Sequence, residues 1–177
     1  ILFVMVMTAF IMAAAWPWIN IALIKNGNPI LGIIAHPPTN TVWFGSKDNA
    51  VVRKNNAEKK ISVSNSKKND LKVILSNNYD KRTKALTNKL PYSQIEHYSS
   101  SLKFCRLAEG KAHLYLRLES ISKWDIAAGD AILRSAGGIL LDKEGNAFKY
   151  NSKSSRTGSF FAVSSKSIWK KHLKANF

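Results

Sequence analysis

The first clear structural pattern in the chain is a pair of apolar runs separated by a short polar turn. Residues 19–24 and 30–35 are almost entirely apolar, and they flank a polar stretch that contains Asn26-Gly27. An Asn-Gly pair between two apolar runs is typical of a tight β-hairpin, because both residues accept the left-handed backbone that such a turn needs. We therefore expect buried sheet over residues 19–35.

Downstream of residue 70 the pattern alternates between strands and helices. Short apolar runs predict strands, whereas apolar residues at helical spacing, ended by Gly110 or by Gly137-Gly138, predict helices. Strands alternating with helices indicate an α/β layered domain. The predicted strands cover residues 71–76, 112–116, 139–141 and 160–163, and the predicted helices cover 81–90, 101–109, 124–136 and 165–174.

The stretch between these two parts is polar. Residues 46–70 are rich in Ser, Asn and Lys and predict an exposed connection around one short strand at 61–63. We place a domain boundary here. The expected division is an apolar segment of uncertain status at 1–18, a portion of a sheet domain at 19–45, and an α/β domain at 46–177.

The first 24 residues contain no charged side chain. As a helix they would be long enough to cross a bilayer, which takes about 20 residues, so membrane attachment through residues 1–18 is one reading. The stretch lacks the basic start of a signal peptide, and Pro17 and Asn20 interrupt it. Buried sheet is the preferred reading from residue 19 onward.

Charge is distributed unevenly along the chain. The formal net charge is +16, with 27 Lys and Arg against 11 Asp and Glu, and the first acidic residue is Asp48. A strongly basic chain favours anionic partners without saying which. The single cysteine, Cys105, excludes an internal disulfide framework and fits a reducing compartment, so we expect a cytoplasmic location, with peripheral attachment to the inner membrane as the alternative.

Two motifs carry a family resemblance. The run Ser-Ser-Leu-Lys-Phe-Cys at 100–105 and the run Trp-Asp-Ile-Ala-Ala-Gly at 124–129, followed by Ala-Gly-Gly at 136–138, resemble the inositol monophosphatase superfamily. With Ala-Glu-Gly at 108–110 and Leu-Tyr-Leu-Arg at 114–117, the chain is most similar to the 3'(2'),5'-bisphosphate nucleotidases. The resemblance covers about residues 19–163. It implies an α/β layered sandwich of the sugar-phosphatase type, made of a C-terminal α/β domain and the end of an N-terminal sheet.

The resemblance also implies chemistry. These nucleotidases remove a phosphate from adenosine 3',5'-bisphosphate with Mg²⁺, a reaction connected with sulfur assimilation, so a small-molecule phosphate is the implied substrate. An inositol monophosphatase-type sugar phosphatase is the runner-up. Members of the family carry an Asp-Pro-Ile/Leu-Asp-Gly-Thr motif and an upstream Glu-Glu pair, and this sequence has neither. We therefore expect a chain that is cut short or disturbed in its early reading frame, and that is weak or inactive alone.

Four residues form the candidate site. The resemblance makes Asp125 a metal-binding and substrate-binding carboxylate, and a hard divalent cation does prefer oxygen ligands. Taken by itself, Asp125 also fits a helix N-cap. The resemblance makes Ser100, Lys103 and Arg117 substrate contacts, and a hydroxyl, an ammonium and a guanidinium suit phosphate groups. The alternative is that Lys103 and Arg117 are solvated surface charges.

The remaining chemistry-bearing residues are assigned structural roles. We expect Trp124 and Cys105 in the core, and Glu119 and Asp130 as surface charges in preference to groups supporting Asp125. His36 precedes Pro37-Pro38 in a predicted turn. The four histidines have no spacing that would place two imidazoles on one metal, which argues against a histidine metal site.

Two other classes of function stay open. The lysine-rich loops suit non-specific contact with nucleic acid, but they contain few aromatic residues and match no recognised module, so no specific nucleic-acid partner is expected. A membrane-attached remnant without catalysis is the second class. The sequence is also compatible with a homodimer.

Overall fold

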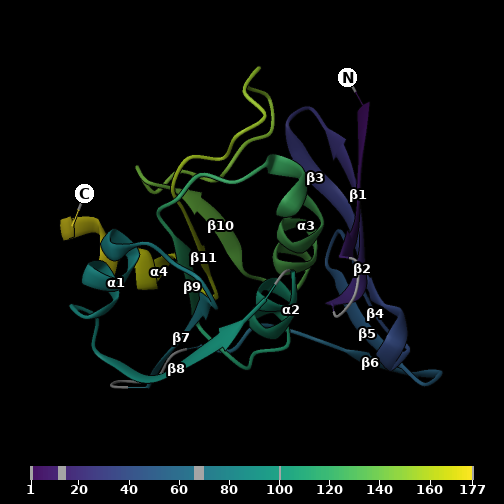
Figure 1. Ribbon diagram of the computed structural model, residues 1–177, viewed down its shortest axis with the longest axis horizontal. Helices are drawn as coiled ribbons and strands as arrows, with labels where there is room; N and C mark the ends of the chain where they lie inside the picture. Colours follow the sequence, from purple (N-terminus) through teal and green to yellow (C-terminus); the bar gives the residue numbers. More distant parts are fainter. Residues whose placement is uncertain (1, 12–14, 66–69, 100, 177) are drawn as a thin grey trace.

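The computed structural model describes residues 2–11, 15–65, 70–99 and 101–176, and these fold into two sheets with helices between and beside them (Figure 1). The first sheet is antiparallel throughout and its strands lie in sequence order. Its six strands are β1 (Leu2–Ile11), β2 (Ala15–Lys25), β3 (Asn28–His36), β4 (Thr41–Ser46), β5 (Asn49–Lys54) and β6 (Ala57–Lys60).

The predicted hairpin is confirmed. β2 and β3 pair antiparallel, and Asn26 and Gly27 both have positive φ, 50° and 71°. This is the backbone of a type I′ turn, whose twist matches that of the strands it joins. The Tyr150 amide donates to the Gly27 carbonyl at 3.0 Å, so the turn is also tied to a distant loop.

The second sheet has five strands in the order β10-β11-β9-β7-β8. β7 pairs parallel with β8 and with β9, whereas β11 pairs antiparallel with β9 and β10. The carboxyl ends of β7 and β9 therefore meet at one edge, the usual place for ligand sites in parallel sheets. The strands are β7 (Leu71–Ser76), β8 (Tyr92–Tyr98), β9 (Leu114–Arg117), β10 (Ile139–Asp142) and β11 (Phe160–Val163).

Two helices form the layer between the sheets. α2 (Leu102–Ala108) and α3 (Ala127–Ser135) pack against each other; α3 also packs against β2, β3 and β4 of the first sheet and β10 of the second (Figure 1). Glycine allows this closeness: a Cβ on Gly32 would stand 2.3 Å from the Ala128 carbonyl oxygen, and one on Gly45 would stand 2.5 Å from Ile132 Cα. The larger apolar core surrounds these helices.

The other face of the second sheet has its own cover. α1 (Lys81–Thr87) and the C-terminal helical segment bury a second apolar cluster against β7, β9, β10 and β11. Asp80 caps α1 by accepting from the Thr83 amide at 2.7 Å. The C-terminal segment is made of α4 (Lys166–Ile168), a π-helical turn (Trp169–Leu173) and a 3-10 turn (Lys174–Asn176). The α/β layered sandwich expected from the pattern is confirmed.

The polar stretch after residue 46 is where the prediction was wrong. β5 and β6 extend the first sheet to Lys60, and residues 61–63 form no strand. Asn55 and Asn56 have positive φ, 48° and 66°, so an Asn-Asn turn joins two strands that are polar because they lie at the sheet edge. The change from first to second sheet falls between Lys60 and Leu71, later than the expected boundary at residue 46.

The apolar N-terminal stretch is strand, not helix, wherever the structure describes it. β1 and β2 pair over most of their length, with an irregularity near Ala9 and Ile11. In the described parts of the chain, no helix combines the length and apolar character that a membrane crossing requires. Over residues 2–11 and 15–18 the helical reading was therefore wrong, and residues 1 and 12–14 lie outside the described residues.

Candidate functional site

Three of the four predicted site residues lie on three elements that meet near the carboxyl end of β9. Arg117 is the last residue of β9, Lys103 lies in the first turn of α2, and Asp125 ends the 3-10 turn (Lys123–Asp125) before α3. The positive charge of Arg117 lowers the pKa of both Lys103 and Asp125, so it is an electrostatic neighbour of each. Ser100 lies outside the described residues.

Lys103 is buried, with 6% of its surface exposed, so the surface-charge reading of this residue was wrong. Its Nζ donates to the Tyr98 carbonyl at 3.3 Å and lies 5.2 Å from the centre of the Tyr115 ring. Burial first, and then the like charge of Arg117, lower the pKa of Lys103 to about 7. An anion here would favour the charged lysine, so this amine can gain a proton on ligand binding.

Arg117 is held at the ends of two parallel strands. Its Nη1 donates to Ser76 Oγ, on the last residue of β7, at 3.0 Å, and its Nη2 donates to Glu119 Oε2 at 3.2 Å. Its Nε is buried and has no hydrogen-bond partner among the described residues. Buried donors normally find partners, so this one marks a place where an acceptor would be stabilised. Glu119 is partly exposed, consistent with the expected surface charge, but it also pairs with Arg117.

Tyr115 and Ser76 belong to the same neighbourhood, and sequence reasoning missed both. Tyr115 is 1% exposed, and burial raises its pKa to about 12, against the opposing effect of Arg117 and Ser76. It packs edge-on against Phe104 and Phe160. Residues two apart on a strand share a face, so the position of Tyr115 relative to Arg117 was the available signal.

Asp125 is held by its own turn. Its Oδ2 accepts from the Ser122 amide at 3.2 Å, and its amide donates to the Ser122 carbonyl at 3.0 Å. It does not cap α3, whose N-cap is Ile126. Burial raises the pKa of Asp125, whereas the Ser122 hydrogen bond and the charges of Arg156 and Arg117 lower it. Within the described chain no hydrogen bond reaches Oδ1, which leaves that oxygen for a cation or a protonated ligand group.

The start of α2 is tied to the first sheet. Ser101 Oγ donates to Asn20 Oδ1 at 2.5 Å, although the two residues are far apart in sequence. Both are buried, and Asn20 Nδ2 has no partner among the described residues. The contact fixes the helix turn that carries Lys103, so β2 helps to position the site.

The residues present do not complete a metal site. Among the residues that the structure describes, no group of three or more His, Cys, Asp or Glu side chains comes close enough to hold an ion. Asp125 offers one carboxylate, and no acidic residue precedes Asp48 in the sequence. Divalent cations of the Mg²⁺ type are held by several oxygen ligands, so Asp125 alone does not fit a bound ion.

For two residues near the site, the burial predicted from the sequence was wrong. Trp124, expected in the core, is 43% exposed, because the 3-10 turn before α3 points it away from the packed helix. Asp130, expected at the surface, is fully buried. Arg134 donates to both of its carboxylate oxygens, at 2.8 and 2.9 Å, and Tyr150 OH donates to Oδ2 at 3.1 Å. This pair stabilises α3 and its contact with residue 150.

The remaining expectations concern residues outside the site. Cys105 is buried, as predicted, and burial raises the pKa of its thiol, so it is no activated nucleophile. His36 stacks on Trp18, with ring centres 4.3 Å apart, and its Nδ1 lies 2.7 Å from Thr39 Oγ1. These contacts agree with a structural role in the turn after β3.

Comparisons with known proteins agree with this fold and extend over most of the chain. The Inositol monophosphatase family matches residues 8–175. The 3'(2'),5'-bisphosphate nucleotidase CysQ of Escherichia coli strain K12 is 35% identical over 146 residues, which are 82% of this chain and 59% of the relative. The chain thus spans about three fifths of the length of that curated relative.

Two solved structures show the same fold. CysQ from Bacteroides thetaiotaomicron aligns with a TM-score of 0.75 and 23% identity over 83% of this chain and 62% of that chain. The Thermotoga maritima IMPase aligns with a TM-score of 0.72 and 22% identity over 89% of this chain and 59% of that chain. At these identities the likeness establishes the architecture.

Proposed function

The chain belongs to the inositol monophosphatase family, and from its site we propose that it binds the phosphate groups of a nucleoside bisphosphate. The candidate ligand is adenosine 3',5'-bisphosphate, and the activity proposed for the complete protein is hydrolysis of a phosphomonoester in sulfur assimilation. The observation that carries the proposal is the meeting of Lys103, Arg117 and Asp125 near the carboxyl end of β9.

Two cations suit the phosphate groups. Arg117 has a buried Nε without a partner among the described residues, and a phosphate oxygen would satisfy it. Lys103 is poised to be neutral or charged near neutral pH, so a phosphate dianion would shift it fully to the ammonium form. Ser100, two residues before α2 in the sequence, is proposed as a further hydroxyl contact. Together they would offset the charge on the phosphoryl group, the main requirement in its transfer.

The proposed cofactor of the complete protein is Mg²⁺, with Asp125 as one of its ligands. A divalent ion supplies charge neutralisation and activates water when it is bound. Since the described residues form no multi-carboxylate cluster, this chain by itself is expected to bind the nucleotide but to turn it over weakly or not at all. Phosphate release comparable to that of the Escherichia coli relative would refute this part of the proposal.

Binding is tested apart from turnover. Titration calorimetry with adenosine 3',5'-bisphosphate in the presence of a chelator should show binding, and Arg117→Gln should weaken it by about 10-fold or more, the usual loss of a charged hydrogen bond. The matched control is Arg82→Gln, because Arg82 is largely exposed and, among the residues that the structure describes, contacts only neighbouring Asp80 and the Leu118 carbonyl.

The proposal fails if both variants bind as the wild type does, or if affinity follows only total charge and salt. Asp125→Asn supplies the metal arm of the test. It should leave chelator-buffered binding unchanged or slightly tighter, because it removes a negative charge beside the phosphate, and it should abolish any tightening by Mg²⁺. Retained tightening in this variant would remove Asp125 from the metal assignment.

A further inference from the structure

A hollow lies between α2 and the face of the first sheet that packs on the helix layer. Its volume is about 400 Å³, within the range of roughly 300–1,000 Å³ that is typical of small-molecule sites. No residue of the candidate site described above lines it. The α2 helix contributes Arg106 and other residues of the same side, and strands β2 to β5 contribute side chains that include Trp18, His36, Trp43 and Val52.

Three aromatic rings form one wall of the hollow. Trp18 stacks on His36, with ring centres 4.3 Å apart, and on Trp43, with ring centres 6.1 Å apart. Burial lowers the pKa of His36, so its ring is neutral near neutral pH and adds to an uncharged wall. Trp43 Nε1 donates to Glu109 Oε1 at 2.6 Å, which fixes the indole in place. Aromatic rings pack favourably against one another, so this wall favours a ligand that carries an aromatic ring.

Arg106 supplies a polar group beside this wall. Its Nη1 lies 3.9 Å from Glu109 Oε2 and its Nη2 lies 3.8 Å from Glu96 Oε2, so both ion pairs use the terminal nitrogens. Its Nε is buried and has no hydrogen-bond partner among the described residues. A buried donor without an acceptor is unfavourable, so a ligand oxygen that reaches Nε would be stabilised there.

The charges around the hollow favour a ligand with a single negative charge. Lys54, Arg106 and Lys111 line the hollow together with Glu109, and Lys111 forms an ion pair with Glu109 Oε2. When Glu96 is included, because it pairs with Arg106, the cations exceed the carboxylates by one. A carboxylate matches this excess. A phosphate dianion would exceed it and would meet the like charge of Glu109, which opposes binding.

We propose that this hollow binds a small aromatic carboxylate. The ring of the ligand packs against Trp18 and Trp43, its carboxylate accepts from Arg106 Nε, and Lys54 at the rim adds a favourable charge. The site is distinct from the proposed bisphosphate site, because neither Arg117 nor the other residues of that site line the hollow.

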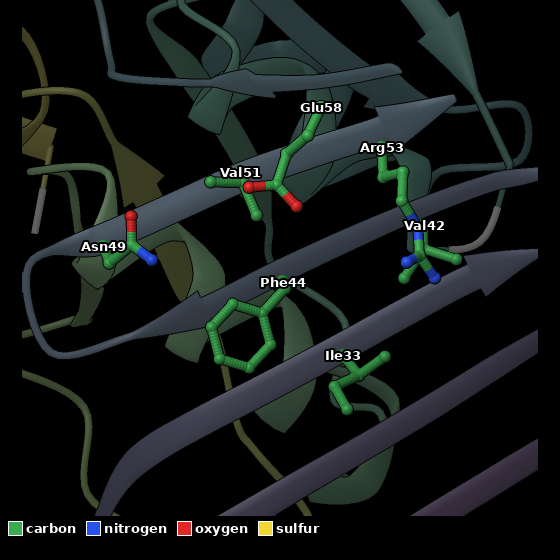
Figure 2. A pocket seen from close by; sticks show the side chains of 7 residues that line it. All are labelled: Ile33, Val42, Phe44, Asn49, Val51, Arg53 and Glu58. Atoms are coloured by element: carbon green, nitrogen blue, oxygen red, sulfur yellow. The ribbon is translucent and has the colours of Figure 1, made fainter. Parts of the chain in front are cut away.

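A second depression lies on the opposite face of the same strands and provides a control (Figure 2). Val51 lines this depression, whereas the next residue, Val52, lines the hollow, because successive residues of a strand point to opposite faces. The charged residues of the second depression are one cation, Arg53, and one anion, Glu58, and none of its described lining residues has a buried donor without a partner. It therefore lacks both features that favour an anion in the hollow.

The test measures binding of phenylacetate to the 177-residue chain by ligand-observed NMR, and tryptophan fluorescence reports on the wall. Phenylacetate should bind with a Kd in the millimolar range or tighter, as is usual for so small a ligand. Phenylacetamide has the same ring without the charge, and cyclohexylacetate has the same charge without the aromatic ring. Each should bind about 5-fold or more weakly than phenylacetate.

Variants locate the probe. Val52→Phe should abolish binding by filling the hollow, whereas Val51→Phe, on the other face of β5, should bind phenylacetate as the wild type does. Arg106→Gln should weaken binding by about 10-fold, and Arg117→Gln should leave it unchanged. Circular dichroism checks that each variant folds. If Val52→Phe fails to fold, Lys54→Gln, at an exposed position, should weaken binding by about 3-fold.

The absence of saturable binding, or equal affinity for all three probes, would overturn the proposal. So would binding that is lost in Arg117→Gln and kept in Arg106→Gln, because the probe would then occupy the candidate bisphosphate site. These outcomes are independent of the proposed function, which is tested with adenosine 3',5'-bisphosphate. A chain that binds phenylacetate in the hollow but does not bind the bisphosphate would contradict the proposed function alone.

Discussion

Lys103 combines a nearly complete burial, with 6% of its surface exposed, with a pKa that burial and the like charge of Arg117 lower to about 7. Its ammonium is stabilised by the Tyr98 carbonyl and the face of Tyr115, which are weaker partners than a carboxylate. The charged amine therefore lowers the free energy of unfolding when the site holds no anion. A buried amine with a lowered pKa is typical of a site that binds an anionic ligand.

The pH dependence of stability should reveal this cost. The folded pKa of Lys103, about 7, lies below its ordinary value of 10.5, so the unfolded chain binds more protons between these pH values, and stability contributed through this group rises with pH across that window. At about 1.4 kcal/mol per pKa unit, the effect amounts to several kcal/mol.

Lys103→Met keeps the packing and removes the charge. It should be more stable than the wild type at about pH 6, and the difference should shrink toward about pH 9.5, because there the folded wild type no longer carries the charge. Urea unfolding in phosphate-free buffers measures the difference in free energy of unfolding between the two proteins. Lys89→Met, at an exposed position, is the control. A difference that stays constant with pH would show that Lys103 titrates normally.

At the scale of elements, the contact between α3 and the first sheet depends on two glycines. A Cβ at Gly32 or Gly45 would stand within 2.5 Å of backbone atoms of α3, and backbone atoms cannot move aside as a flexible side chain can. Alanine at either position would force the helix away from β3 and β4. Because α3 follows directly on Asp125, that displacement would also reach the candidate site.

Gly32→Ala and Gly45→Ala should each lower the free energy of unfolding by about 3 kcal/mol, the upper part of the range for an overpacked core. Gly158→Ala is the informative control, because its φ of 69° is unfavourable for alanine but nothing lies within 4 Å of the added Cβ. That change should cost about 1 kcal/mol, from backbone strain alone. Chemical denaturation compares the free energies of unfolding of the three variants. Equal decreases in all three would contradict a steric clash between the sheet and α3.

Some elements were predictable from local sequence and others were not. The Asn26-Gly27 hairpin and the strands at 71–76 and 160–163 follow from turn chemistry and apolar runs, which are local signals. β6 and β8 were missed because they are edge strands with exposed, polar side chains, and such strands resemble loops in composition. Their pairing is decided by neighbouring strands that lie elsewhere in the sequence.

The candidate site was predictable in its residues but not in its environment. Family resemblance supplied Lys103, Arg117 and Asp125, whereas the burial of Lys103 and the contact of Arg117 with Ser76 arise only from tertiary packing. Asp130 illustrates the same limit. A carboxylate in a basic chain is usually exposed, and only the fold brings Arg134 and Tyr150 around it.

At the scale of the whole molecule, the high net charge destabilises the compact folded state. A chain with 27 basic and 11 acidic residues repels itself when folded, and the lysines of the C-terminal segment add to this without any acidic residue after Glu144. Salt screens such repulsion over about 10 Å at 0.1 M. Ionic strength should therefore change the stability of this protein.

Raising NaCl from about 0.05 to 0.5 M should increase Tm, by about 2–4 °C for each kcal/mol of repulsion relieved. Replacing exposed Lys170 and Lys171 by glutamate should reduce that salt dependence, because it lowers the net charge by four. Differential scanning calorimetry at low protein concentration measures the change in Tm for both chains. A salt response equal in both charge states would contradict a role for self-repulsion.

The strand at the far end of the first sheet has one more consequence. In the described part of the chain no strand pairs with the outer edge of β6, and every residue of β6 is exposed, including Glu58, Lys59 and Lys60. If a strand of another copy paired with the edge of β6, it would place lysines of like charge on neighbouring strands. Their repulsion opposes continuous fibril growth. Charge at this border therefore protects an otherwise apolar sheet from open-ended polymerisation on that side.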